Sequence, residues 1–215
     1  MPTDTWDKLP TSRRDRVLNA AEREFGSHGY SGGSLNVIAR EAGVAKGSLF
    51  QYFTDKLDFY AYVCACATER IRGELVPVLI ALDPTRPFGP WLTDMLSAWI
   101  AYFRTHPVER GIVAATNLEM DPEVRAVVRD VANAAYLEVL RPLVVGFRDR
   151  DDLNADVDVD VLLAYLLLLA PHLALAPYVP GIDAVLGLLD ADEKHIDDVV
   201  RRLVAVLEVA VTPEP

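Results

Sequence analysis

The chain has 215 residues, of which 51% are hydrophobic and 25% are charged, a composition that excludes a largely disordered protein and is typical of a folded one. The formal net charge of -11 is unevenly distributed. Residues 1–56 hold eight Lys or Arg and seven Asp or Glu, whereas the remaining residues hold 13 and 25. The N-terminal part can therefore meet a polyanion, although an acidic surface without such a partner has the same counts.

The chain lacks the usual signals for export and for membrane insertion. Residues 1–10 contain no apolar segment of the kind that a secretory signal requires. The apolar stretch 161–179 is interrupted by Pro171 and Pro177 and contains His172, which favours a buried helix pair over a membrane span. Two cysteines are too few for a disulfide framework. We therefore expect a cytoplasmic protein that does not associate with membranes.

The N-terminal region is predicted to form three helices. Apolar residues at helical spacing indicate a first helix that begins at Thr11 or Ser12, one of which serves as the N-cap, and that ends at Gly29. After a short polar loop, Ser34 can cap a second helix that stops at Gly43.

The second and third helices have the features of a helix-turn-helix. Gly43 can adopt the left-handed conformation that ends a helix sharply, and Val44 then anchors the turn in the core. A third helix is expected over residues 45–53, with Leu49 facing inward and the small Ala39 allowing close approach. Two short helices joined by a glycine-containing turn of about three or four residues form this motif.

The rest of the chain is predicted to be helical as well, since no segment alternates at period two. The helices are expected near residues 56–82, 88–105, 107–118, 122–148, 157–178 and 194–211. Pro77 and Pro142 fall inside two of them and should kink or divide them. The fold class is therefore all-α, with a three-helix unit over residues 1–55 and a larger helical domain over residues 56–215.

The segment from Gly43 to Lys56 reads GVAKGSLFQYFTDK and resembles the recognition helix and following turn of the TetR family of bacterial transcriptional regulators. Upstream residues at positions typical of that family are Ala20, Ala21, Phe25, Gly29, Tyr30, Ile38, Ala39, Ala42, Gly43 and Val44. The resemblance covers roughly a quarter of the chain. It implies an N-terminal helix-turn-helix DNA-binding domain over residues 1–55, and a helical effector-binding and dimerisation domain over residues 56–215.

The resemblance, together with the chemistry of each position, predicts a set of DNA-binding residues. They are Ser34, Lys46, Gly47, Ser48, Gln51, Tyr52, Thr54 and Lys56. Lys46 and Ser48 open the recognition helix, where side chains meet base edges in the major groove, and Lys46 is expected to read guanine. Gly47 lets the helix backbone come close to the DNA.

The other predicted contacts have plainer alternatives. Gln51 can pair with adenine or be exposed polar surface, and the Tyr52 hydroxyl can reach a phosphate or belong to a core aromatic. Ser34 suits a phosphate contact or an ordinary N-cap. Thr54 and Lys56 begin the next helix, where a DNA phosphate accounts for the positive charge.

The sequence departs from the family at two positions of this segment. The family usually has Ser or Thr where this chain has Ala45, and Tyr where it has Phe50. One helix cap and one hydroxyl contact are therefore missing, so operator preference cannot be copied from relatives.

For the larger domain, the resemblance implies a small-molecule pocket in the central helices and a homodimer formed by the helices near 157–178 and 194–211. The candidate effector-binding residues are Trp99, Tyr102, Phe103, His106, Tyr136, Phe147, Tyr165 and His172. Aromatic pockets suit a hydrophobic effector, but aromatic residues at helical spacing are more often plain core. We expect a repressor that binds palindromic double-stranded operator DNA. Binding of the effector is expected to tilt the helix that begins at Lys56 and so to release the protein from the DNA.

Other classes of protein fit the sequence less well. The sequence contains no catalytic constellation, so we expect neither an enzyme nor a cofactor. The acidic run after residue 150 is not a calcium loop, because Val157 and Leu163 stand where Gly and a bidentate Glu are required. The alternative is a helical small-molecule or lipid-binding protein without DNA activity. An activator in place of a repressor also remains open.

Overall fold

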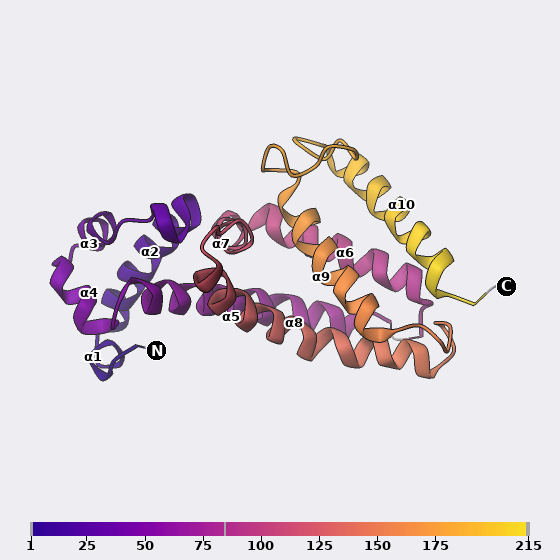
Figure 1. The fold of residues 1–215 in the computed structure, drawn as a ribbon, viewed down its shortest axis with the longest axis horizontal. Helices are drawn as coiled ribbons and strands as arrows, with labels where there is room; N and C mark the ends of the chain where they lie inside the picture. Colours follow the sequence, from indigo (N-terminus) through magenta and orange to yellow (C-terminus); the bar gives the residue numbers. More distant parts are fainter. Residues whose placement is uncertain (1, 84, 214–215) are drawn as a thin grey trace. The chain divides into compact units, whose positions relative to one another are not determined.

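The computed structural model describes residues 2–83 and 85–213. Over these residues the chain forms ten α-helices and no β-strand, which confirms the all-α prediction. In chain order the helices are α1 (Asp4–Asp7), α2 (Thr11–Gly32), α3 (Leu35–Ala42), α4 (Lys46–Tyr52), α5 (Lys56–Ala81), α6 (Phe88–Thr105), α7 (Pro107–Asn117), α8 (Pro122–Asp149), α9 (Val159–Leu175) and α10 (Glu193–Val211) (Figure 1).

The helices belong to two compact units, each made of two stretches of chain. The first unit comprises Met1–Ile71 and His106–Ala132, and the second comprises Arg72–Thr105 and Asn133–Pro215. Helices α5 and α8 each begin in the first unit and end in the second. The division after residue 55 expected from the sequence concerns function, and it stays a prediction.

Helix boundaries follow the predicted ones except near breakers. Helix α2 begins at Thr11 with Pro10 at its N-cap, so no side chain caps it and the predicted Thr11 or Ser12 cap is wrong. Gly29 breaks α2 with φ of +65°, as expected, but the chain then forms a further helical stretch through Gly32 in place of the predicted loop. Neither Pro77 nor Pro142 divides its helix. A proline removes a single intrahelical hydrogen bond, and a long helix retains the rest.

The short helix α1 was not predicted. It buries Trp6, which is 1% exposed, and the indole Nε1 donates to the Tyr62 hydroxyl at 3.1 Å. The Trp6 ring also packs on Phe53, with their centroids 5.0 Å apart. A four-residue helix with one apolar residue has no periodicity to detect.

The core of the first unit holds the helix-turn-helix. Phe53 and Phe59 stack with ring centroids 4.2 Å apart, and Phe25 lies edge-on to Phe59. Ile38 and Leu49 bring α3 and α4 into the same buried cluster. Since burial of one large apolar side chain contributes about 1.5 to 3 kcal/mol, this cluster fixes α3 and α4 on α2 and α5.

A buried ionic network lies in the same unit. The Arg70 guanidinium of α5 donates from Nη2 to Glu22 of α2 at 2.6 Å and from Nε to Glu109 of α7 at 2.8 Å. Both carboxylates are buried. Burial raises the pKa of Glu22, and Arg70 opposes that rise. The network therefore depends on the arginine to keep two buried negative charges side by side.

In the second unit, α6 packs against both α9 and α10. The Trp99 indole on α6 is buried and donates to the Ala170 carbonyl of α9 at 2.7 Å. None of the helices that the structure describes is long and apolar enough to cross a membrane.

Candidate nucleic-acid interface

The turn between α3 and α4 has the geometry that the sequence predicts. Gly43 adopts the left-handed conformation, with φ of +66° and ψ of +39°. Its N–H donates to the Arg40 carbonyl at 3.2 Å, and the Val44 N–H donates to the Ala39 carbonyl at 2.9 Å. Leu49 is 2% exposed and packs beneath the turn. The predicted helix-turn-helix is therefore confirmed at its corner residues.

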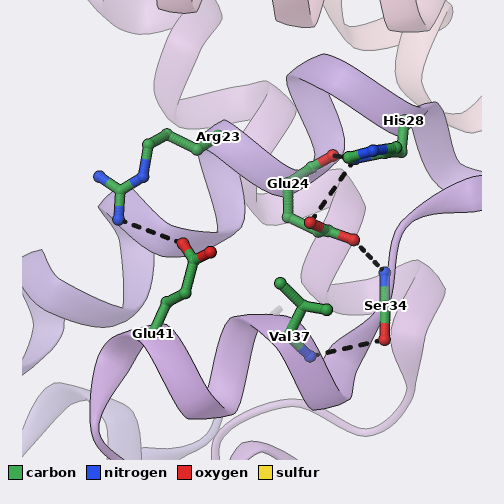
Figure 2. Close-up of polar contacts among 6 residues, drawn as sticks. All are labelled: Arg23, Glu24, His28, Ser34, Val37 and Glu41. Carbon is green, nitrogen blue, oxygen red and sulfur yellow. Dashed lines mark hydrogen bonds and ion pairs between the residues drawn. The ribbon is translucent and has the colours of Figure 1, made fainter.

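Ser34 caps α3 and is itself held by α2 (Figure 2). Its hydroxyl accepts the Val37 N–H at 3.5 Å, and its own N–H donates to the Glu24 carboxylate at 2.8 Å. Glu24 is buried, with His28 Nδ1 3.5 Å from its second carboxylate oxygen. The N-cap role of Ser34 is confirmed, and a phosphate contact there stays a prediction.

A second contact joins the same two helices farther along α3. The Arg23 guanidinium lies 3.4 Å from the Glu41 carboxylate, with both side chains exposed (Figure 2). Such a surface pair is worth at most about 1 kcal/mol. The buried Glu24 is therefore the stronger tie between α2 and α3, and nothing in the sequence distinguishes it from a glutamate on a solvated helix face.

The outer face of α4 consists of Lys46, Gly47, Phe50 and Gln51, which fall on one side of a helix with 3.6 residues per turn. All four are exposed, and Phe50 is 50% exposed. A Cβ atom added at Gly47 has no atom of this chain within 4 Å. Glycine at this position is therefore not required by internal packing, although it costs helix stability.

The N-cap position of α4 is Ala45, which makes no side-chain hydrogen bond. This confirms the missing cap noted in the sequence. Ser48, another predicted DNA-binding residue of this helix, is half-buried, and its N–H donates to the Ala45 carbonyl at 2.9 Å.

Tyr52 lies on the inner side of α4. It is 2% exposed, and its ring centroid is 5.7 Å from that of Trp6. This burial favours the core-aromatic interpretation, and a contact between its hydroxyl and a phosphate stays a prediction.

Thr54 and Lys56 have partners within the chain. The Thr54 N–H and hydroxyl donate to the Asp58 carboxylate at 3.0 and 3.1 Å, while the Asp58 N–H donates to Asp55 at 2.8 Å. Asp55 therefore caps the Asp58 N–H in the first turn of α5, and Asp58 holds Thr54 just before the helix. The Lys56 ammonium lies 4.7 Å from the centroid of the Tyr30 ring, and burial lowers its pKa. These contacts within the chain are one explanation for Thr54 and Lys56. The contacts of both residues with the DNA backbone stay predictions.

Ring contacts group some of the eight candidate effector residues. Four of them gather in the second unit, where Trp99 packs on Phe103 and Tyr136 at 4.8 and 5.4 Å and Tyr102 packs on Phe103 at 5.2 Å. Phe147 packs elsewhere, on Phe88 and Trp91.

The other three candidates are Tyr165, His172 and His106. Tyr165 and His172 line a groove of about 710 Å³ on α9 and α10, whereas His106 belongs to the first unit. His106 and His172 are the expected polar contacts of the pocket, and helical spacing does not tell which face each candidate occupies. Effector binding by the eight residues stays a prediction.

The groove on α9 and α10 is largely apolar and open to solvent. Leu168 is 73% exposed and Val206 is 76% exposed. The residues that line it are Leu92, Val157, Asp158, Val161, Leu162, Tyr165, Leu168, Leu169, His172, Leu203, Val204, Val206, Leu207, Ala210 and Val211.

A helix-turn-helix with an exposed second helix, in an all-α chain, defines a DNA-binding protein of the helix-turn-helix class. Residues 17–63 match the family model of bacterial regulatory proteins of the tetR family. The transcriptional repressor AcnR of Corynebacterium diphtheriae is 30% identical over 72% of this chain and 75% of its own length. AcnR of Corynebacterium efficiens is 26% identical over 92% of this chain and 100% of its own length. The chain belongs to the TetR family of transcriptional regulators.

A solved structure has the same fold at low sequence identity. The transcriptional regulator FadR of Bacillus subtilis, crystallised in complex with stearoyl-CoA, is 15% identical with a TM-score of 0.67. The match covers 88% of this chain and 96% of FadR.

Proposed function

We propose that this regulator is a repressor that binds a palindromic operator as a homodimer and leaves the operator when a hydrophobic small molecule binds. The outer face of α4 carries the proposal. Lys46 and Gln51 present a cation and an amide to solvent on the same side of the helix as Gly47. A cation suits guanine and an amide suits adenine in the major groove.

Gly47→Ala is expected to separate folding from DNA binding. The methyl group meets no atom of this chain, and alanine favours a helix over glycine by about 0.5 to 1 kcal/mol. The free energy of unfolding should therefore rise slightly. The same methyl group stands where the DNA backbone or base edges approach, so operator affinity should fall about tenfold, a loss of about 1.4 kcal/mol.

The measurement needs an operator, which selection from random-sequence duplexes with the wild type supplies. Gly146→Ala on α8 is the matched control, because its added Cβ also meets open space and it lies outside the helix-turn-helix. Equal operator affinity for wild type and both variants, or no enriched sequence at all, contradicts the proposal.

The dimer is proposed to form through α9 and α10. An exposed apolar groove on these helices has side chains such as Leu168 and Val206 that remain unburied in one chain. A second copy can cover that surface across a two-fold axis. Two recognition helices then read half-sites about 34 to 36 Å apart or at multiples of that spacing, which makes the operator palindromic.

The effector is proposed to bind in the second unit, near the aromatic cluster around Trp99. An apolar pocket with aromatic walls takes hydrophobic ligands, and the same fold in FadR holds stearoyl-CoA. Helix α5 begins in the first unit and ends in the second, so a ligand that favours one position of α5 can shift the population of DNA-binding dimers. Release of a labelled operator by hydrophobic ligands tests this step, and unchanged affinity at saturating ligand contradicts it.

The alternative of a small-molecule carrier without DNA activity is not favoured. A carrier has no use for exposed Lys46, Gly47 and Gln51 beside a sharp helical turn. The AcnR relatives are repressors, which supports repression over activation.

A further inference from the structure

The N-terminal segment (residues 2–9) contacts the far end of the recognition helix. The Thr3 hydroxyl donates to the Gln51 carbonyl at 2.6 Å, and the Thr3 N–H donates to the Tyr52 carbonyl at 2.9 Å. The last carbonyls of a helix have no partner within that helix. Helix α4 ends at Tyr52, and its C-cap residue Phe53 is extended, without the left-handed conformation of a glycine cap. Thr3 therefore supplies the donors that a C-terminal cap otherwise provides.

Thr3 is in turn fixed to the core. Its carbonyl accepts the Trp6 N–H at 2.9 Å, and Trp6 is buried against Tyr52 and Phe53. The Trp6 indole reaches α5 through the Tyr62 hydroxyl. The N-terminal segment thus connects the last turn of α4 to α5 by packing and by hydrogen bonds.

The contact matters because α4 is short. A helix of seven residues has little stability of its own, and its last turn frays unless it is held. Gln51 lies in that turn with its side chain exposed and its carbonyl bound to Thr3. Any motion of the last turn moves the Gln51 amide, and bidentate pairing with a base tolerates little displacement.

We propose that Thr3 is a positioning residue for Gln51. By capping the recognition helix, it sets the selectivity of the protein at the base pair that Gln51 reads, without touching DNA. This inference rests on the proposed function of the outer face of α4.

Thr3→Val tests the inference, since valine keeps the shape and the backbone N–H but loses the hydroxyl donor. The affinity of the variant is measured for the selected operator and for each of its single base-pair substitutions. At the base pair where Gln51→Ala loses selectivity, the selectivity of Thr3→Val should be about threefold to tenfold lower than that of the wild type. This decrease corresponds to the loss of about one hydrogen bond. Other base pairs should be unaffected.

Two further variants and a measurement of stability complete the test. Thr3→Ser restores the donor and should restore selectivity. Thr3→Val combined with Gln51→Ala should be no less selective than Gln51→Ala alone, because both act through one side chain. Thermal unfolding of Thr3→Val is measured in parallel to separate lost selectivity from lost folding.

Each contrary outcome identifies what is wrong. If Gln51→Ala changes selectivity but Thr3→Val does not, the positioning role of Thr3 is wrong and the proposed interface stands. An equal loss at every base pair together with a smaller salt dependence shows a phosphate contact by Thr3, which also overturns the inference. If Gln51→Ala leaves selectivity unchanged at every position, the assignment of Gln51 itself fails, and the inference fails with it.

Discussion

Leu168→Glu is expected to convert the dimer to a monomer and to lower operator affinity by about two orders of magnitude or more. Leu168 is 73% exposed in one chain and lines the apolar groove on α9 and α10. A two-fold interface receives the substitution twice, and an unpaired charge in an apolar interface costs several kcal/mol. A monomer then binds a single half-site and loses the ~100-fold to 10,000-fold gain that two linked sites provide.

Sedimentation equilibrium and operator titration of the same samples measure this effect. Ile80→Glu is the matched control, because Ile80 is 74% exposed and lies on α5, outside the groove. The control should remain dimeric and bind operator like the wild type. A dimeric Leu168→Glu protein with full affinity places the interface elsewhere.

Arg70→Met is expected to lower the free energy of unfolding by about 2 to 4 kcal/mol. The substitution removes the guanidinium that donates to the buried carboxylates of Glu22 and Glu109, and breaking a buried ion pair in this way costs about 3 to 5 kcal/mol. The expected decrease is smaller than that of a fully buried pair because the Arg70 side chain is 37% exposed and solvent weakens such pairs. Urea denaturation of both proteins at pH 7 measures the difference.

The decrease in the free energy of unfolding caused by Arg70→Met should become smaller when the pH is lowered from 7 to 5. Burial and then Glu109 raise the pKa of Glu22 in the folded protein, while Arg70 lowers it. Without Arg70 the folded pKa rises further above the unfolded value. A carboxyl with a raised pKa contributes stability below its unfolded pKa, and that contribution is lost as the pH rises through the folded pKa. The carboxyl is protonated to a greater extent at the lower pH, which removes part of the penalty.

Arg72→Met is the control for this prediction. Arg72 pairs with Glu138 at 3.0 Å, but the Glu138 side chain is 64% exposed. Its removal should change the free energy of unfolding by less than about 1 kcal/mol at either pH. A similar loss in both variants, or a loss in Arg70→Met that does not depend on pH, contradicts the role of the buried network.

The sequence predicted the helix-turn-helix because local chemistry determines it. Gly43 is required at a left-handed corner, Ser34 caps the helix before it, and Leu49 falls on the inner face by periodicity. Each of these signals lies within a few residues of the feature it specifies.

Other parts of the site depend on pairing between distant residues and left no local signal. Glu24 and Arg70 read as ordinary charges on solvated helix faces, yet they bind partners 10 to 48 residues away. Thr3 is 48 residues from the carbonyl it caps. The aromatic effector candidates could not be separated from plain core for a related reason, since periodicity shows that a residue is apolar but not which neighbour it packs against.

The most direct test of the account is the affinity of Lys46→Ala for the selected operator and for random-sequence duplex over a range of salt concentrations. Lys194→Ala, which removes an exposed lysine at the start of α10, is the control. If Lys46 reads guanine, its removal should cost about 1 to 3 kcal/mol of operator affinity and relax selectivity at one G·C pair, while non-specific binding changes little. If Lys46→Ala retains the selectivity of the wild type, or loses affinity equally for operator and random duplex, the outer face of α4 does not read the operator.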